Sequence, residues 1–354
     1  MARPYGTVDP ALDPVLSAFG VSPDRVEKVP TGLINATYRI QRGPEVWALQ
    51  RVNGIFSPLV HEDIDSVTQH LAQKGVTTPR LRPALDGKLW IERTDEPHAG
   101  VWRMLTWIDG RNIDKLADPA EAREAGVMLG RFHAALGDLE WSFRARRLGV
   151  HDTPRHLTAL RSALEAHSAH RLHAQVAALA QTLFDSIATL PPLQGLPERV
   201  VHGDPKITNI MFSHSGPRAI ALVDLDTVAP MPLPLELGDA FRSWCNPAGE
   251  DATRVSFDLD LFQPAIEGYA QATRGLLEPH EVAAIAPAIG TIMLELSARF
   301  AADALQESYF GWNPNRYATR GDHNLLRARG QLALGLDFLA KRPDADAITR
   351  RIYR

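Results

Sequence analysis

Four polar side chains in one short stretch have the types and spacing needed to handle a metal-bound phosphate. Asp204, Lys206 and Asn209 lie in a polar loop after the apolar pair Val200-Val201, and Asp224 ends a later apolar run. A carboxylate and an amide oxygen, completed by phosphate and water, form the oxygen shell that octahedral Mg²⁺ prefers. We therefore expect Asn209 and Asp224 to share one cation, with Asp204 facing it.

A predicted turn supplies the geometry that this site needs. Apolar runs at 210–212 and 219–223 are separated by turn-forming residues at 213–217, which favours a β-hairpin. A hairpin brings its two ends together, so Asn209 and Asp224, which flank it, can converge. Asp204 would then orient a hydroxyl group and accept its proton late, while Lys206 would neutralise charge on a transferring phosphoryl group.

The spacing of Asp204 and Asn209 alone has little weight, because a loop Asp followed by a turn Asn is common by chance. His202-Gly203 directly before Asp204, the flanking apolar runs and the second Asp after a turn make a chance match much less credible. We therefore interpret this stretch as a site for phosphoryl transfer.

These residues resemble the catalytic and metal loops of the aminoglycoside phosphotransferase and choline kinase superfamily. Bacterial N-acetylhexosamine 1-kinases are a closer match, because they also have a Lys two residues after the catalytic Asp and a metal strand that continues as Asp-Leu-Asp-Thr, like residues 224–227. Further similar stretches lie at 32–38, 49–53, 151–154, 238–239 and 323–325. The resemblance implies that ATP and Mg²⁺ are bound, that Asp204 and Lys206 are catalytic, and that Asn209 and Asp224 hold the metal.

The distribution of patterns along the chain agrees with the α+β, protein-kinase-like two-lobe fold that the resemblance implies. Strand-like runs occur at 36–40, 46–51, 89–93 and 101–107, and a helix-like segment at 59–73. After Gly110, amphipathic helix patterns dominate at 121–136, 155–190, 259–273 and 279–305. We predict a nucleotide-binding lobe at 1–108, with a small antiparallel sheet and one helix, and a mainly helical catalytic and substrate-binding lobe at 109–354.

The resemblance assigns the nucleotide phosphates to a hairpin that contains Gly32, Asn35 and Thr37. Gly32 permits close backbone approach, and Asn35 and Thr37 offer hydrogen-bond donors. From the residues alone, an ordinary β-turn explains the single glycine better than a phosphate-binding loop does. The hinge implied by resemblance contains Leu105 and Trp107, whose backbone would read the adenine edge.

Gln50 stands where the superfamily has a phosphate-binding Lys, and a neutral amide cannot replace that charge. The hexosamine kinases also have Gln there, so the departure favours that subfamily. Arg51 has the charge, but strand alternation points it to the opposite face. Asp65 matches the acidic residue that usually pairs with the missing Lys, although a solvated helix surface explains it equally well.

Arg299 and Tyr309 are the predicted acceptor-binding residues. Hexosamine kinases have an Arg and a Tyr at nearly this spacing, both in contact with the sugar, and the present chain is one residue shorter between them. A structural role is open for Arg299, because Glu295 and Asp303 stand four residues on either side and suit helical ion pairs.

Composition excludes several other classes of protein. The formal net charge of −4 over 354 residues gives no electrostatic case for nucleic acid or an anionic membrane as partner. The apolar stretch at 282–305 carries three charged residues and is expected to be a buried helix. The single cysteine, Cys245, allows no intramolecular disulfide, and no signal peptide is visible, so we expect a cytoplasmic monomer or homodimer.

The preferred function from sequence is phosphorylation of the anomeric hydroxyl of an N-acetylhexosamine. Two alternatives stay open. The acceptor could be an aminoglycoside, choline, ethanolamine or another sugar. The chain could also be a non-catalytic pseudokinase, for which Gln50 is the only support.

Overall fold

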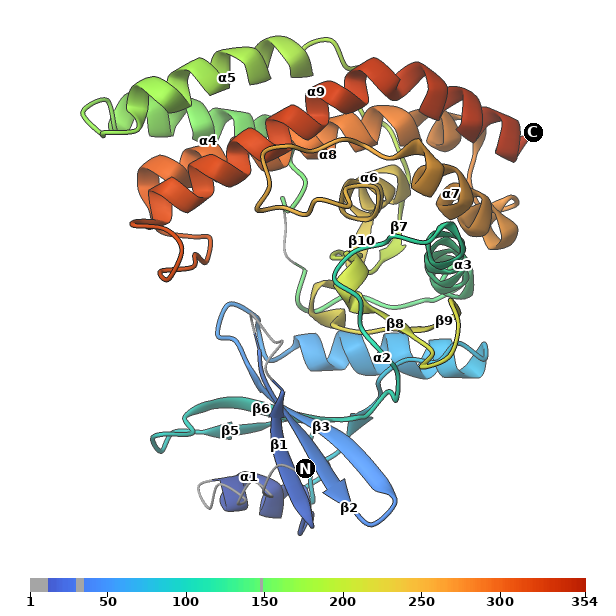
Figure 1. Cartoon of the computed structure of the whole chain (residues 1–354). Helices are drawn as coiled ribbons and strands as arrows, with labels where there is room; N and C mark the ends of the chain where they lie inside the picture. Colours follow the sequence, from blue (N-terminus) through green and yellow to red (C-terminus); the bar gives the residue numbers. More distant parts are fainter. Residues whose placement is uncertain (1–11, 30–34, 147–148) are drawn as a thin grey trace.

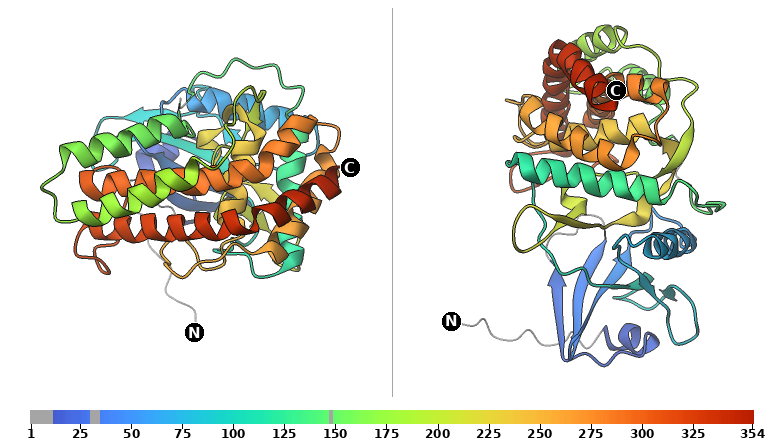
Figure 2. Two further views of the ribbon diagram at one scale, coloured as in Figure 1. Left: turned by 90° about the horizontal axis from the view of Figure 1, so that it is seen from above. Right: turned by 90° about the vertical axis from the view of Figure 1, so that its right-hand side faces the viewer.

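The computed structural model describes residues 12–29, 35–146 and 149–354, and Gly32 therefore lies outside the described residues. The chain forms two lobes, a small lobe built on a sheet and a larger helical lobe (Figures 1 and 2). The α+β architecture expected from the sequence, with a small antiparallel sheet and a larger helical part, is confirmed.

The N-terminal lobe contains a six-stranded antiparallel sheet in the order β1-β2-β3-β6-β4, with β5 on the remaining part of β6. Its elements are α1 (Asp13–Ala18), β1 (Arg25–Val29), β2 (Ala36–Arg42), β3 (Glu45–Val52), α2 (Val60–Gln73), β4 (Leu81–Arg82), β5 (Ile91–Arg93) and β6 (Gly100–Thr106). Helix α1 covers the outer face of the sheet, whereas α2 lies between the sheet and the second lobe (Figure 1).

Strand alternation divides the sheet into two faces. Leu49 and Met104 are directly opposite each other in β3 and β6 and pack with α1 in a small core. Arg51 lies on this outer side, where Nη1 donates to the carbonyl oxygen of Pro97 at 3.3 Å. The next position along β3, Gln50, therefore points to the opposite face, toward the second lobe, as the alternation predicts.

The C-terminal lobe is mainly helical. Its elements are α3 (Pro119–Ala135), α4 (Thr153–Ala166), α5 (His173–Ile187), β7 (Glu198–Val201), the 3-10 turn η2 (Ile207–Asn209), β8 (Ile210–Phe212), β9 (Ala219–Leu222), the 3-10 turn η3 (Leu225–Thr227), β10 (Ala229–Pro232), α6 (Leu233–Trp244), α7 (Leu259–Thr273), α8 (Pro279–Gln306) and α9 (Arg320–Tyr353). Two small antiparallel pairs, β7 with β10 and β8 with β9, lie beneath the helices.

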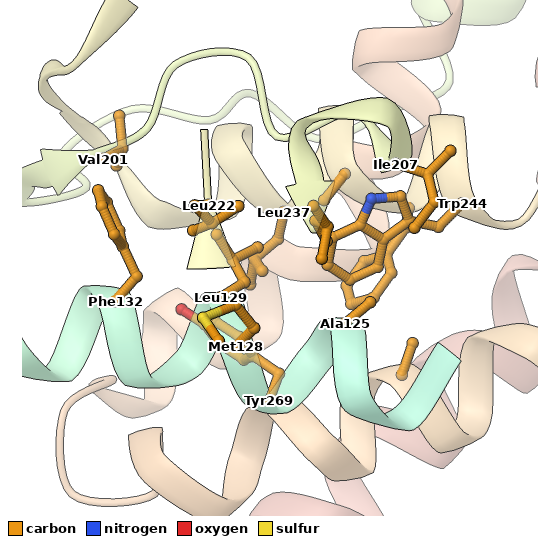
Figure 3. Packing of buried hydrophobic residues seen from close by; sticks show 14 of the residues in the cluster. Ala125, Met128, Leu129, Phe132, Val201, Ile207, Leu222, Leu237, Trp244 and Tyr269 are labelled. Atoms are coloured by element: carbon orange, nitrogen blue, oxygen red, sulfur yellow. The ribbon is translucent and has the colours of Figure 1, made fainter. Parts of the chain in front are cut away.

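A continuous apolar core positions these two pairs. Side chains of α3 pack against β7, β9, α6 and α7, as Figure 3 shows for Leu129 and Phe132 beside Leu222, Leu237 and Val201. Burial of these apolar side chains is the main contribution to the stability of the folded lobe. The strand ends that carry the polar loops are therefore held on a rigid base.

Several sequence expectations need correction. The pattern at 155–190 is two helices, α4 and α5, because residues 167–172 interrupt it. Helices α1, α6 and α9 and strands β1, β4, β7 and β10 were not separately predicted. The helix expected to begin at 155 begins at Thr153, and its N-cap Asp152 accepts from the amide of Arg155 at 3.1 Å.

Helix α8 confirms the expectation of a buried helix at 282–305. Among the described residues, α8 is the one helix whose length and apolar composition would suffice to cross a membrane. Its most apolar window is 78% buried inside the protein, against α4, α5, α6 and α9. Core helices meet this length criterion, and the packing accounts for its composition.

Candidate active site

The catalytic loop begins where β7 ends and is locked against the loop that carries Asp224. His202 is fully buried, and its Nε2 donates to the carbonyl oxygen of Val223 at 2.9 Å. In return, Thr227 Oγ1 donates to the carbonyl oxygen of His202 at 2.9 Å. Gly203 adopts φ 82°, and a Cβ there would stand 2.3 Å from the Thr227 carbonyl oxygen. Only glycine permits this close approach, which explains the Gly before Asp204.

A buried carboxylate from α6 holds the same loop from behind. The two oxygens of Glu236 accept from the backbone amides of His202 and Gly203 at 2.9 and 3.0 Å. His133 Nε2 lies 3.4 Å from the first of these oxygens. Sequence reasoning missed Glu236, because it is 34 residues away along the chain and belongs to a helix that was not predicted.

Asp204 contacts both of the polar residues that follow it. Lys206 Nζ lies 2.5 Å from Asp204 Oδ2, and Asn209 Nδ2 donates to the Asp204 carbonyl oxygen at 2.8 Å and to Oδ2 at 3.2 Å. The Asp204 side chain remains 28% exposed. Burial lowers the pKa of Lys206, but the carboxylates of Asp204 and Asp224 outweigh burial and the net shift is upward. Lys206 is therefore a permanent cation at this site.

The amide orientation of Asn209 matters for metal binding. Because Nδ2 of Asn209 donates to Asp204, the amide oxygen Oδ1 is the atom that remains available to a cation. The hairpin β8–β9 pairs Ile210 with Leu222, and the amide of Val223 donates to the Asn209 carbonyl oxygen at 2.9 Å. Asp224 is thus one residue from the backbone that is bonded to Asn209.

Asp224 has the backbone conformation and the pKa shift typical of a functional carboxylate. It is one of two non-glycine residues with positive φ in the described chain, at φ 67° and ψ 60°, a conformation that costs free energy and concentrates at functional sites. Burial raises the pKa of Asp224 to about 6, and Asp226 and Asp204 act in the same direction. No hydrogen bond to its carboxylate is present within the described part of the chain. A buried, unpaired carboxylate beside an amide oxygen fits a divalent cation such as Mg²⁺.

Asn35, Thr37 and Gln50 lie at the boundary of the two lobes but bond to protein atoms. Asn35 Nδ2 donates to Asp226 Oδ2 at 2.6 Å, and its Oδ1 accepts from the amide of Asn53 at 2.9 Å. Gln50 Nε2 donates to Thr37 Oγ1 at 3.1 Å. All three therefore stand near the metal loop, and their nucleotide contacts remain predictions.

Leu105 and Trp107 lie at the end of β6, where the chain leaves the sheet. Leu105 is buried and is paired with Leu81 of β4. The amide of Trp107 donates to the carbonyl oxygen of Val46 at 3.3 Å, and Arg39 lies 5.6 Å from the centre of its ring. Their role as an adenine-reading hinge stays a prediction.

A group of buried charges continues from the catalytic loop into the helical lobe. Asp239 of α6 lies close enough to raise the pKa of Lys206 and is itself bonded to Arg242, with Arg242 Nε to Asp239 Oδ1 at 2.9 Å. Burial alone would raise the pKa of Asp239, but Arg242 and His151 outweigh it and the net shift is downward. His151 Nδ1 in turn donates to Glu295 at 2.9 Å.

Arg299 lies near this group, since its charge acts on both Asp239 and His151, and its role in binding the acceptor stays a prediction. The alternative of helical ion pairs does not hold. Glu295 is taken by His151 and Thr153, and within the described residues no carboxylate lies within ion-pairing distance of Arg299. Its guanidinium instead stands 5.7 Å from the centre of the Phe310 ring.

Tyr309 lies in a turn that Asp303 organises. The Asp303 carboxylate accepts from the backbone amides of Ser308, Tyr309 and Phe310 at 2.8 to 2.9 Å. The Tyr309 ring is 60% exposed and lies edge-on to Phe310, with ring centres 4.9 Å apart. Phe310 therefore lies beside both Arg299 and Tyr309, and the tyrosine is exposed.

A cavity of about 410 Å³ lies beside the catalytic loop, and none of Asp204, Asn209 and Asp224 lines it. It reaches Gly203 and Thr227 on one side and His151 on the other, with Met231 and Leu235 in its wall. A volume of this size is in the range that holds a small organic ligand.

Comparison with known proteins decides the family. A model of the phosphotransferase enzyme family matches residues 25–279 of the chain. The chain therefore belongs to the phosphotransferase enzyme family. The matched region includes the sheet of the first lobe, both polar loops and Asp239, and the superfamily inferred from the sequence is confirmed.

Solved structures share the fold of this phosphotransferase at low sequence identity. A microcompartment-associated aminopropanol kinase has a TM-score of 0.66 and 17% identity, with 94% of this chain and 98% of that chain covered. An amicoumacin kinase in complex with AMP-PNP and Ca²⁺ has a TM-score of 0.62 and 14% identity, with coverage of 91% and 92%. An aminoglycoside phosphotransferase from Alicyclobacillus acidocaldarius has a TM-score of 0.59 and 13% identity, with coverage of 99% and 98%.

Proposed function

We propose that this phosphotransferase is an ATP- and Mg²⁺-dependent kinase of a small, neutral hydroxyl compound, with the anomeric hydroxyl of an N-acetylhexosamine (GlcNAc or GalNAc) as preferred acceptor. One observation carries the proposal: Asp204, Asn209 and Asp224 lie in two loops that are bonded to each other through His202 and Thr227. Family membership supports phosphoryl transfer, and the amicoumacin kinase of the same fold holds AMP-PNP with a divalent cation.

In the proposed reaction the chain mainly positions groups and balances charge. Asp204 orients the acceptor hydroxyl and takes its proton late, as the new oxygen–phosphorus bond forms and the bond to the departing ADP oxygen breaks. Lys206 balances the charge that gathers on the transferred phosphoryl group. Asn209 Oδ1 and the Asp224 carboxylate would hold Mg²⁺, which neutralises phosphate charge when bound. The use of ATP and the single cysteine favour a cytoplasmic enzyme.

The charges beyond Asp204 support a neutral acceptor over a cationic one. A site for aminoglycosides or choline needs unpaired acidic side chains to attract the cation. Here Asp239 is bonded to Arg242, Glu295 to His151, and Asp303 to backbone amides. Arg299 is a cation on this side with no carboxylate within ion-pairing distance among the described residues, and its guanidinium stands beside the Phe310 ring. The motif at residues 224–227 and Lys206, both shared with hexosamine 1-kinases, favour the sugar.

The acceptor is tested by measuring ADP formation with GlcNAc, GalNAc, other free sugars, choline, ethanolamine, aminopropanol and aminoglycosides, followed by NMR of the product. We expect the fastest turnover with an N-acetylhexosamine and phosphate on C1. Phosphate on C6 would refute the 1-kinase assignment, and preferred use of a cationic acceptor would refute the neutral acceptor.

The pseudokinase alternative is tested by Asp204→Asn. Because this change removes the proton acceptor and not a metal ligand, turnover should fall by at least about 10³-fold while ADP affinity stays near that of the wild type. Asp185→Asn, on an exposed part of α5, serves as the matched control and should change neither quantity. Full activity of Asp204→Asn would overturn the assignment.

Arg299→Met tests the acceptor side. We expect the KM for the acceptor to rise by about tenfold, because one charge-assisted hydrogen bond to the acceptor is lost. The KM for ATP should change little. Arg299→Lys keeps the charge and should retain part of the affinity. An equal rise of both KM values would show that Arg299 supports the fold and not the acceptor.

A further inference from the structure

Three side chains form a row across the inner face of the N-terminal sheet. Thr37 of β2 lies directly opposite Gln50 of β3, and Gln50 lies directly opposite Arg103 of β6. Directly opposed residues share one face of a sheet, and they are bonded in sequence here. Gln50 Nε2 donates to Thr37 Oγ1 at 3.1 Å, and Arg103 Nε donates to Gln50 Oε1 at 2.9 Å.

The row ends on a carboxylate of the other lobe. Both terminal nitrogens of Arg103 bond to Asp226 in a two-pronged ion pair, with Nη2 to Oδ2 at 3.0 Å. The side chains of Arg103 and Asp226 are only 2% and 1% exposed. Asp226 follows Asp224 by two residues in the metal loop, and it also accepts from Asn35, which precedes β2. Two segments of the N-terminal lobe are therefore fixed to the loop that carries the candidate metal ligand.

The usual source of a carboxylate for such a cation, helix α2, does not provide one. Asp65 Oδ2 accepts from Gln69 Nε2 at 2.6 Å on the exposed side of α2. The residue of α2 that faces the pair is His61, which is fully buried and donates from Nδ1 to the Pro58 carbonyl oxygen at 2.6 Å. Arg103 therefore takes its carboxylate partner from the metal loop of the opposite lobe.

We propose that Arg103 is a positioning residue that latches the metal loop to the N-terminal sheet, in place of the strand cation that Gln50 does not supply. The guanidinium is buried and bonded to protein acceptors, so it acts through Asp226 and not on the nucleotide directly. By occupying both oxygens of Asp226, Arg103 fixes the orientation of η3 and leaves Asp224 as the carboxylate available to a cation. This inference rests on the proposed function, because it concerns the metal that accompanies the nucleotide.

If Arg103 acts as this latch, its loss should weaken the binding of ADP with Mg²⁺ but not the binding of ADP without metal. Removal of a partner that orients a metal ligand lowers metal affinity by about 10- to 100-fold. Arg103→Met combined with Asp226→Leu removes both charges together, so neither is left buried and unpaired. In calorimetric titrations we expect this variant to bind ADP with Mg²⁺ about 10- to 100-fold more weakly than the wild type, with essentially unchanged affinity for ADP in EDTA.

A matched control is available in the helical lobe. Arg199 of β7 pairs with the buried carboxylate of Glu281 at 2.8 Å, and among the described residues neither side chain bonds to the metal loop. Arg199→Met combined with Glu281→Leu also removes an arginine–carboxylate ion pair, with Arg199 partly exposed, and should leave both ADP affinities unchanged. Circular dichroism and thermal unfolding verify that each variant is folded before titration.

A second variant keeps the test decisive if the neutral pair, Arg103→Met with Asp226→Leu, does not fold. Gln50→Lys combined with Arg103→Gln moves the cation one strand over in the same row, and it should recover Mg²⁺-dependent ADP binding relative to Arg103→Gln alone. A folded neutral pair with wild-type affinity for ADP and Mg²⁺ would overturn the latch, as would no recovery by the relocated lysine. If the wild type itself binds no ADP with Mg²⁺, the proposed kinase function falls, and the latch falls with it.

Discussion

The two carboxylates of the metal loop, Asp226 and Asp224, have different partners and opposite pKa shifts. Asp226 points to the N-terminal sheet, where Arg103 and Asn35 hold its pKa below the ordinary value although burial acts to raise it. Asp224 accepts no hydrogen bond from the described residues, and burial together with the neighbouring carboxylates raises its pKa to about 6. Asp226 is 3% exposed and Asp224 is partly buried, and the two residues are only two positions apart.

The difference indicates that hydrogen-bond and ion-pair partners, and not position in the motif, separate a structural carboxylate from a functional one. A buried anion whose hydrogen bonds are all satisfied stabilises one arrangement of the chain. A buried anion left without partners costs free energy, and it persists where a ligand will compensate it. Substitution of Asp224 should therefore mainly lower activity, whereas substitution of Asp226 should mainly lower stability.

Asp224→Asn should produce the largest loss of activity in the loop. The amide keeps one oxygen but loses the charge that attracts Mg²⁺, so we expect turnover to fall by at least about 10³-fold. The melting temperature in the absence of metal should be equal to that of the wild type or higher, because an uncompensated buried charge is removed. Enzyme assays and thermal unfolding measure the two effects, and a folded variant with normal turnover would contradict the metal assignment.

Asp226→Asn should mainly affect stability. It leaves the buried guanidinium of Arg103 without its counterion, and breaking such a pair from one side costs about 3 kcal/mol of unfolding free energy. Chemical denaturation with wild type and Asp224→Asn side by side measures the contrast. If Asp224→Asn proves the more destabilised of the two, the division of roles is wrong.

The pH dependence of stability should show the smallest effect. The folded-state pKa of Asp224, about 6, lies above the ordinary value of 3.8, so protonation favours the folded state. The stabilising contribution is present below the ordinary value and is lost as pH rises through about 6. In metal-free buffer the stability of wild type relative to Asp224→Asn should fall by about 1 kcal/mol between pH 5 and 8. A pH-independent difference between the two proteins would refute the raised pKa.

The local part of the site was predictable from the sequence. The hairpin between Asn209 and Asp224 depends on turn residues and apolar runs that are adjacent in the chain, and β8 and β9 follow that pattern. Helix α2 and strands β2, β3 and β6 were predicted within a few residues for the same reason. The direction of Arg51, opposite to Gln50, followed from strand alternation alone.

Contacts between distant segments were not predictable. Arg103 and Asp226 are 123 residues apart, and nothing in the local pattern of β6 distinguishes a latch from an ordinary apolar strand with one Arg. Glu236 was missed because its helix follows directly on a short, proline-containing strand. A charged residue inside an apolar strand was the one available signal for Arg103, since a buried guanidinium requires a partner.

The position of the metal can be observed directly in a crystal structure with ADP and Mn²⁺, by anomalous scattering from the manganese. The account predicts an anomalous peak bounded by Asn209 Oδ1 and the Asp224 carboxylate, with Asp204 facing it and Asp226 still bonded to Arg103. A peak bound to Asp226, or one that touches neither Asn209 nor Asp224, would contradict it.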